Sequence, residues 1–208
     1  MEMIRPYKDE SLNTMYNCLF CDMPLLYKTN TSQQTGYPWN VLLDSNAVEE
    51  WLLAVAADPA SESRMKLLAY HQLKATGHTF DKKELLGVII EVRLENGLDV
   101  LAAYKDGSAR YINHAEKMII WETNTNESES IIHNLFSESL KVVSRIGAWE
   151  APRLPQPNTG DVRINFLVAD GLYFGQGSFD VLASDPMGGP VIHAATNLML
   201  FLTGKVVV

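Results

Sequence analysis

Cysteine is scarce in this sequence, which has Cys18 and Cys21 and no others among its 208 residues. Secreted proteins that depend on disulfides carry more cysteines, arranged as a framework of pairs. The first ten residues also lack an apolar stretch behind a basic start, so we expect no signal peptide. These features predict a reducing compartment, the cytoplasm.

Long apolar runs and clusters of positive charge are also missing. The longest apolar stretches, 51–57 and 197–202, are far shorter than the roughly 20 residues that span a bilayer. The chain is acidic, with a net charge of −8, and its lysines and arginines are scattered along the sequence. Because such a charge repels nucleic acid and anionic lipid, we expect neither a nucleic-acid partner nor a membrane.

No catalytic or cofactor motif stands out. The sequence has no G-x-S-x-G, no H-E-x-x-H and no G-x-x-x-x-G-K-[ST]. Gly175-Gln176-Gly177 begins like a dinucleotide-binding loop, but position 180 is Asp180 and a β-hairpin pattern surrounds it. We interpret these glycines as a β-bulge or a close backbone contact. We therefore expect no bound cofactor and leave open whether the protein is an enzyme.

The two cysteines have C-x-x-C spacing, which occurs in redox-active pairs and in half of a zinc site. The sequence has neither a second such pair nor two closely spaced histidines to complete a metal site. The cysteines fall near the end of a predicted helix and partly on its apolar face. We predict that they are buried and inert and that no metal binds, with redox activity or metal binding as the alternatives.

The spacing of apolar residues predicts the elements. Steps of three and four residues indicate helices at 10–22, 46–57, 59–76, 126–146 and 191–202. Alternating residues between turn signals indicate strands at 86–94, 98–104, 109–121, 162–168 and 172–182. Because tight turns join these strands, we predict antiparallel pairing, with a three-stranded meander followed by a hairpin, hence an α+β protein.

We predict one domain over 1–208, with a helical part at 1–80 and a sheet-containing core at 81–208. The element order is α-α-α-β-β-β-α-β-β-α. It makes an antiparallel sheet of about five strands with helices packed mainly on one face.

This order is similar to that of the type III secretion chaperones, which run helix, three strands, helix, two strands, helix. The resemblance is one of element order, and the chain has roughly 80 additional N-terminal residues. Those chaperones are small, acidic and dimeric, so the resemblance implies a dimeric, chaperone-like protein.

The start of the last predicted helix is a candidate ligand site. Gly188 and Gly189 precede that helix, and His193 lies about one turn into it. Exposed N–H groups at a helix start favour an anion. These three residues are therefore candidate ligands for a small anion, with a plain helix start as the alternative.

Polar residues also recur on the predicted first and third strands, namely Glu91, Arg93, Arg110, Asn113 and His114. Together they could form a binding patch. A sheet with one face open to water shows this alternation in any case, so we interpret them as the solvent face.

These patterns favour a non-enzymatic binding, adaptor or chaperone-like protein, whose partner is another protein or a second copy of itself. Candidate partner contacts are the apolar last helix with its 206–208 tail and four loop residues, Tyr37, Trp39, Trp149 and Leu154. The alternative is an anion-binding protein or an enzyme, with a pocket near the 175–193 loop and helix start.

Overall fold

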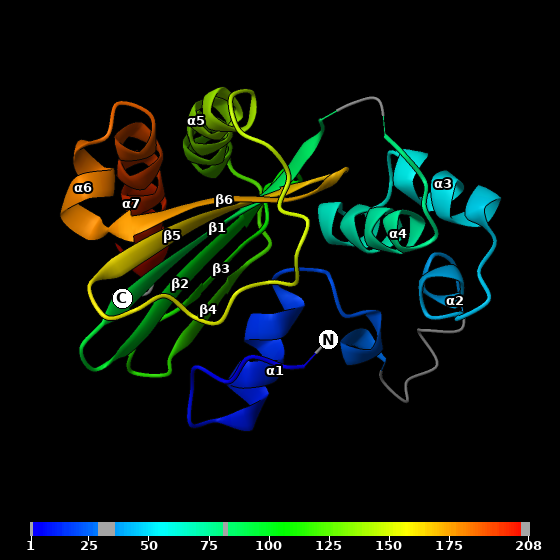
Figure 1. The fold of residues 1–208 in the computed structure, drawn as a ribbon, viewed down its shortest axis with the longest axis horizontal. Coiled ribbons are helices and arrows are strands. Elements are labelled where there is room, and N and C mark those ends of the chain that lie inside the picture. The colour runs from blue at the N-terminus through cyan, green and yellow to red at the C-terminus, as the bar shows by residue number, and fades with distance from the viewer. Residues whose placement is uncertain (1, 29–35, 81–82, 205–208) are drawn as a thin grey trace.

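A computed structural model gives the fold and describes residues 2–28, 36–80 and 83–204 (Figure 1). The helices are α1 (Glu10–Cys18), the 3-10 helix η1 (Pro24–Tyr27), α2 (Trp39–Leu42), α3 (Glu49–Ala57), α4 (Ser63–Ala75), α5 (Asn126–Val143), α6 (Phe179–Ser184) and α7 (Gly188–Gly204). The strands are β1 (Leu85–Leu94), β2 (Gly97–Tyr104), β3 (Ala109–Ile112), β4 (Met118–Trp121), β5 (Asp161–Val168) and β6 (Gly171–Ser178). The predicted α+β class is confirmed.

The strands form one antiparallel sheet in the order β4-β3-β2-β1-β5-β6. β1 to β4 make a meander, and Leu94 pairs with Gly97 across the first of its turns. The β5–β6 hairpin then joins the other edge of β1, where Val88 lies opposite Phe166. β1 therefore lies inside the sheet, between β2, which follows it directly in sequence, and β5, which follows only after β4 and α5.

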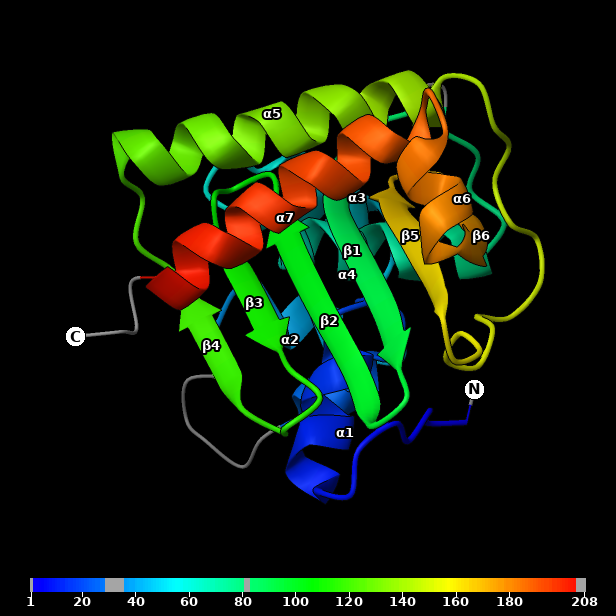
Figure 2. The ribbon, with the colours of Figure 1, turned by 90° about the vertical axis from the view of Figure 1, so that its left-hand side faces the viewer.

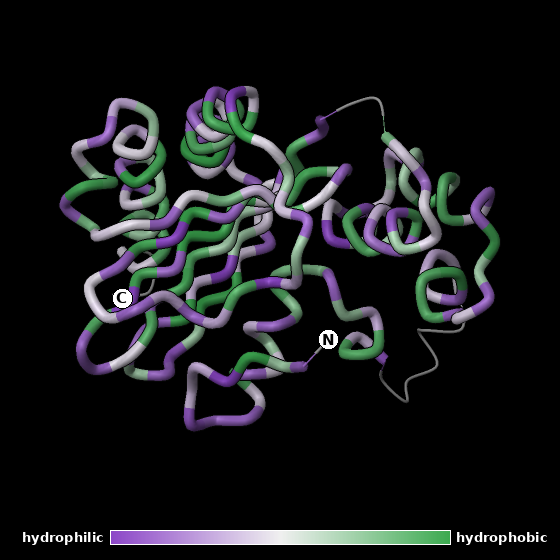
Figure 3. Tube along the Cα trace, viewed as in Figure 1, coloured by the Kyte–Doolittle hydropathy of each residue, from purple (hydrophilic) through white to green (hydrophobic). Residues whose placement is uncertain are grey.

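Helices cover both faces of the sheet, as the views in Figures 1 and 2 show. α5, α6 and α7 pack on the face that carries Val88 and Ile90. α1 and α4 lie on the face that carries Ile89 and Leu98, and α2 and α3 pack against α4 in the same layer. We call these the α5–α7 face and the α1–α4 face. Apolar residues recur along the central strands between the two helical layers (Figure 3).

The prediction that helices pack mainly on one face is therefore corrected. Residues 85–90 of β1 are Leu-Leu-Gly-Val-Ile-Ile, and all of them are buried. Such a nearly continuous apolar run is typical of a strand covered on both sides, whereas a half-exposed strand alternates strictly.

The sheet also has six strands instead of about five, because the predicted strand 109–121 is two strands with a turn at 113–117. Glu116 lies in this turn with a φ of 60°. Its carboxylate accepts hydrogen bonds from the backbone N–H groups of Lys8 and Asp9, at 3.0 and 3.2 Å. The turn is thus held by the N-terminal segment, a contact that no local pattern predicts.

α7 crosses the sheet diagonally in Figure 2. Val191, Leu198 and Leu202 are buried against the sheet, while Leu200 is 57% exposed. The helix is therefore not buried all round, although its composition is apolar. Among the residues that the structure describes, no helix has the length and apolarity needed to cross a bilayer.

Candidate binding cleft

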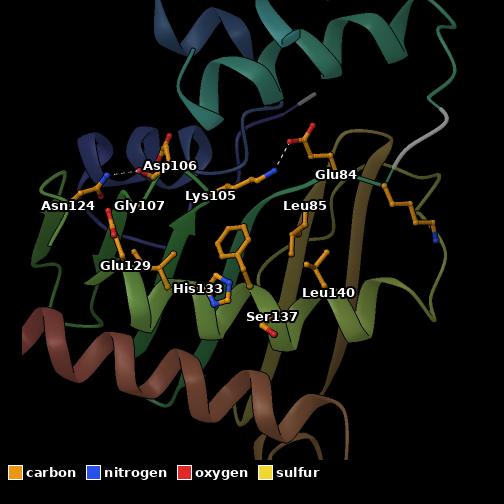
Figure 4. A pocket seen from close by; sticks show the side chains of 13 residues that line it. Glu84, Leu85, Lys105, Asp106, Gly107, Asn124, Glu129, His133, Ser137 and Leu140 are labelled. Atoms are coloured by element: carbon orange, nitrogen blue, oxygen red, sulfur yellow. Dashed lines mark hydrogen bonds and ion pairs between the residues drawn. The ribbon is translucent and has the colours of Figure 1, made fainter. Parts of the chain in front are cut away.

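A cleft of about 1020 Å³ lies between α5 and the neighbouring ends of β1 and β2. This volume is at the upper end of the range of roughly 300–1,000 Å³ that is usual for ligand pockets. Figure 4 looks into the cleft, with α5 along one side and Glu84, Lys105 and Asp106 across from it. Glu84 precedes β1, whereas Lys105 and Asp106 lie in the turn between β2 and β3.

The start of α5 is fixed by a capping box. The Thr125 hydroxyl accepts a hydrogen bond from the Ser128 N–H at 3.1 Å. The Ser128 hydroxyl in turn accepts one from the Thr125 N–H at 3.0 Å. Because two of the N–H groups left open at a helix start are satisfied in this way, the helix begins at a defined residue. The register of every later side chain along the cleft follows from it.

α5 presents two parallel rows of side chains to the cleft. Both repeat every four residues, a spacing that keeps side chains on one face of a helix. One row is apolar, and the other is polar: Ile132, Phe136 and Leu140; Glu129, His133 and Ser137. Eight residues of α-helix rise about 12 Å, so the two rows make an elongated wall.

The polar row of α5 has no partners in the part of the chain that the structure describes. The side chains of Glu129, His133 and Ser137 make no hydrogen bond or ion pair there, either with one another or with the opposite wall. Three polar groups that face a cleft without protein partners are available to a ligand.

The opposite wall is already paired. Lys105 Nζ lies 2.7 Å from Glu84 Oε1. Asp106 accepts hydrogen bonds from the Ser63 N–H at 2.7 Å and from the Ser108 hydroxyl at 2.7 Å. Burial acts to raise the pKa of Asp106, but the hydrogen bonds from Ser108 and Ser63 outweigh it and lower that pKa. Asp106 therefore remains a carboxylate that positions this turn.

Gly188 and Gly189 do not precede α7, as predicted, but are its first two residues, and His193 follows in the same helix. The N–H donors at this helix start are in use. Asp185 Oδ1 accepts hydrogen bonds from the N–H groups of Met187 and Gly188, at 2.8 and 2.7 Å. The Gly189 N–H donates to the Asp185 carbonyl at 2.9 Å. Hydrogen bonds from Gly188 and Met187 lower the pKa of Asp185. Anion binding at this helix start stays a prediction, and an anion would have to displace this carboxylate.

The polar residues predicted as a solvent face do not form one patch. Arg110 is 3% exposed and pairs with Glu122, and Glu91 is fully buried beside Arg163. His114 Nδ1 lies 2.9 Å from Asp99 Oδ1. The interpretation as a solvent face is corrected, because helices cover both sides of the sheet and several of these charges are paired inside it.

Both cysteines are unpaired, Cys21 being buried and Cys18 half-buried. Burial raises the pKa of the Cys18 thiol to about 11 and that of Cys21 to about 12. The Tyr27 hydroxyl lies 3.4 Å from Cys21 Sγ. The prediction that both cysteines are buried is confirmed for Cys21, whereas Cys18 is only partly buried. The raised pKa values disfavour the reactive thiolate form of both side chains. Within the described ranges, no group of three or more His, Cys, Asp or Glu side chains could hold a metal ion.

The glycines at 175–177 lie in β6, and the β5–β6 register runs without a shift from Asp161–Ser178 to Val168–Gly171. The predicted bulge is therefore wrong here, and the sheet's irregularity lies between Leu85 and Gly87 in the β1–β5 pairing. The alternative, a close backbone contact, is also wrong: a Cβ at Gly175 would meet nothing within 4 Å, and one at Gly177 would lie at an ordinary contact distance of 3.5 Å from the Leu182 side chain of α6.

The predicted partner contacts are scattered. Tyr37 is 53% exposed and Trp149 is 36% exposed. Trp149 is held in place, since its Nε1 donates to the Pro152 carbonyl at 3.0 Å. Trp39 stacks on Tyr27 at 5.8 Å. The 206–208 tail lies outside the described residues.

The polar row of α5 was missed from the sequence. The repeat of Glu129, His133 and Ser137 beside an apolar stripe is visible in the letters, but it is also what any half-exposed helix shows. Only the fold places this row beside the β2–β3 turn and so makes it the wall of a cleft.

In comparisons with known proteins, no protein-family model, no curated protein and no solved structure matches this chain. The geometry alone therefore carries the argument about function.

Proposed function

We propose that this is a non-catalytic binding protein, which holds a short, elongated segment of another protein in the cleft beside α5. The observation that carries the proposal is the pair of parallel rows on α5, one apolar and one polar, with the polar row unpartnered among the described residues. A peptide segment has the matching chemistry, because side chains of both kinds recur along it at regular intervals.

The charges of the cleft also support a peptide. Its lining carries Lys83 and Lys105 against Glu84, Asp106 and Glu129, which leaves one negative charge in excess. A phosphate or nucleic-acid ligand requires a positive surplus. A segment with mixed side chains and an apolar anchor fits better, and Leu140 offers it a side chain that is 47% exposed.

The arrangement of Glu129, His133 and Ser137 supports binding more than catalysis. A nucleophile and its base lie within about 2.6–3.2 Å of each other in most such sites. These three side chains make no hydrogen bond to one another. We further propose a cytoplasmic location, since the two unpaired cysteines suit a reducing compartment.

The proposal can be tested by selecting peptides from a random display library on the immobilised protein and measuring the enriched peptides by fluorescence anisotropy. Leu140→Glu should weaken their binding at least about tenfold, because it removes the apolar contact and adds a charge at the anchor. Asn134→Glu adds the same charge to an exposed residue of α5 outside the cleft and should leave binding unchanged.

Native mass spectrometry of the same proteins separates the two kinds of partner. A dimer that Leu140→Glu converts to a monomer would identify the bound segment as part of a second copy. If no peptide is enriched and the protein is a monomer, or if enriched peptides bind both variants equally, the proposal is wrong.

A further inference from the structure

A second, smaller cavity of about 270 Å³ lies between α7 and the sheet. None of the residues that line this cavity also lines the cleft beside α5, and its walls are mostly apolar. The apolar lining comes from the sheet, α6 and α7: Ile90, Val92, Leu101, Val162, Phe179, Ile192, Ala195 and Met199. On α7 the larger side chains Ile192 and Met199 also line the cavity, and between them in sequence the smaller side chains of Ala195 and Thr196 leave room at this point of the crossing. Phe179, 40% exposed, lies at the start of α6.

Three polar side chains line the cavity, namely Asp99, Tyr111 and Thr196, and the hydrogen bonds that they make leave all three as acceptors. The Tyr111 hydroxyl donates its hydrogen to Asp99 Oδ2 at 2.7 Å. The Thr196 hydroxyl donates its hydrogen to the Ile192 carbonyl at 2.9 Å. The single hydrogen of each hydroxyl is therefore already donated, so each can only accept a hydrogen bond from a ligand.

Asp99 has capacity left to accept. Its Oδ1 lies 2.7 Å from the His114 N–H and 2.9 Å from His114 Nδ1, and its Oδ2 accepts from Tyr111. A carboxylate offers about four lone-pair sites, so one remains open on Oδ2. Burial, reinforced by Asp99, raises the pKa of Tyr111 well above its ordinary value. The hydroxyl thus keeps its hydrogen and continues to donate it to Asp99.

We propose that this cavity binds a small, mainly apolar amine, whose ammonium group donates to Asp99 while its apolar body lies between α7 and the sheet. A ligand with a carboxylate or phosphate head is excluded by the same geometry, because it would meet a carboxylate and two spent hydroxyls. A volume of about 270 Å³ is just below the range that is usual for ligand pockets, so the ligand is small. This site does not depend on the proposed function of the cleft.

Three probes of matched shape test the chemistry: 2-phenylethylamine, 2-phenylethanol and 3-phenylpropionate, each titrated into the full-length protein and followed by ligand-observed NMR. We expect the amine to bind most tightly, the alcohol more weakly and the carboxylate not at all. A charge-assisted hydrogen bond accounts for a difference of about tenfold or more between the amine and the alcohol.

Two variants test the location. Asp99→Asn removes the charge and should make the amine and the alcohol bind about equally. Ala195→Leu fills the cavity from α7 without touching a polar group and should abolish binding of both. Asn197→Ala changes an exposed residue of α7 that does not line the cavity and should bind like the wild type. Circular dichroism of each variant shows whether it is folded.

Three results would each overturn the inference: no saturable binding of the amine, binding of the carboxylate as tight as that of the amine, or amine binding unchanged in a folded Ala195→Leu variant. If Asp99→Asn does not fold, the comparison of the three probes on the wild type and on Ala195→Leu still decides the question.

Discussion

The two faces of the sheet are closed by different means. On the α1–α4 face, Glu91 is fully buried and accepts hydrogen bonds from the Tyr16 hydroxyl at 2.6 Å and from Asn165 at 2.9 Å. Arg163 lies 3.4 Å from the same carboxylate. On the α5–α7 face, the buried serines Ser128 and Ser139 bond, among the described residues, only within α5 and the three residues before it.

A network closes the α1–α4 face further out. Arg153 donates to Asp22 at 3.0 Å and to Asn17 at 2.8 Å, and its guanidinium lies 4.0 Å from the centre of the Phe20 ring. Directional bonds of this kind fix the position of a helical layer relative to the sheet. Apolar contacts are not directional, so the α5–α7 layer can leave room: both the 1020 Å³ cleft and the 270 Å³ cavity border it. A cavity on the α1–α4 face measures about 80 Å³.

The largest expected effect comes from Glu91→Ala on the α1–α4 face. Arg163 has a side chain that is 4% exposed, so the variant leaves its charge buried without the carboxylate. We expect a loss of about 3–5 kcal/mol in the free energy of unfolding, measured with urea. Lys141→Ala, which breaks an exposed pair with Glu138, should cost less than about 1 kcal/mol. Equal losses would contradict the polar closure of this face.

The thiols of the α1–α4 layer should react slowly with a disulfide reagent in the native protein. With a pKa of about 11 for Cys18 and about 12 for Cys21, the thiolate fraction at neutral pH falls at least about a hundredfold below that of a free cysteine. The rate of colour release before and after unfolding in urea measures this difference. Two equivalents that react at once in the native state would show that the layer opens.

The same substitution on both faces sharpens the comparison. Ala69 of α4 is fully buried, so Ala69→Leu should overpack the α1–α4 layer and cost about 1–3 kcal/mol. Ala195 is also buried but borders the 270 Å³ cavity, so Ala195→Leu should be neutral or stabilise the protein by about 1 kcal/mol. Urea unfolding of the pair gives both values, and a similar loss in both would mean that the α5–α7 face has no spare room.

The smallest expected effect is a dependence of stability on pH from His71, which lines the 80 Å³ cavity with Asp22 and Lys74. Burial lowers the pKa of His71. The charge of Asp22 acts to raise this pKa, whereas the charge of Lys74 lowers it further. Below the ordinary value of 6.5 the unfolded chain binds more protons than the folded one, so stability falls as the pH falls. His71→Gln should flatten this part of the urea profile between about pH 8 and pH 5, and a parallel profile would assign the effect to another group.

The sequence predicts the elements better than their surroundings. The turns Asn96-Gly97 and Asp106-Gly107, and the stripe of Ile132, Leu135 and Phe136, are local signals, and the structure has the meander and α5 there. Ile89 and Leu167 are apolar at positions where a half-exposed strand would be polar. They are the sequence signal for a second buried face, which the prediction of one covered face overlooked. The candidate sites could not be predicted, since Asp99 and Thr196, like Lys105 and His133, meet only after the sheet has formed.

The place of β1 inside the sheet has a consequence during synthesis. β2 follows β1 directly, but the other edge of β1 pairs with β5, which begins at Asp161. At roughly 5–20 residues per second, a ribosome takes several seconds to make the stretch between Leu94 and Asp161. For that time a nascent chain would carry an unpaired edge on a strand rich in isoleucine and valine, which is a template for aggregation. α5 is translated during this interval and could shield one face of β1, while its edge hydrogen bonds must wait for β5.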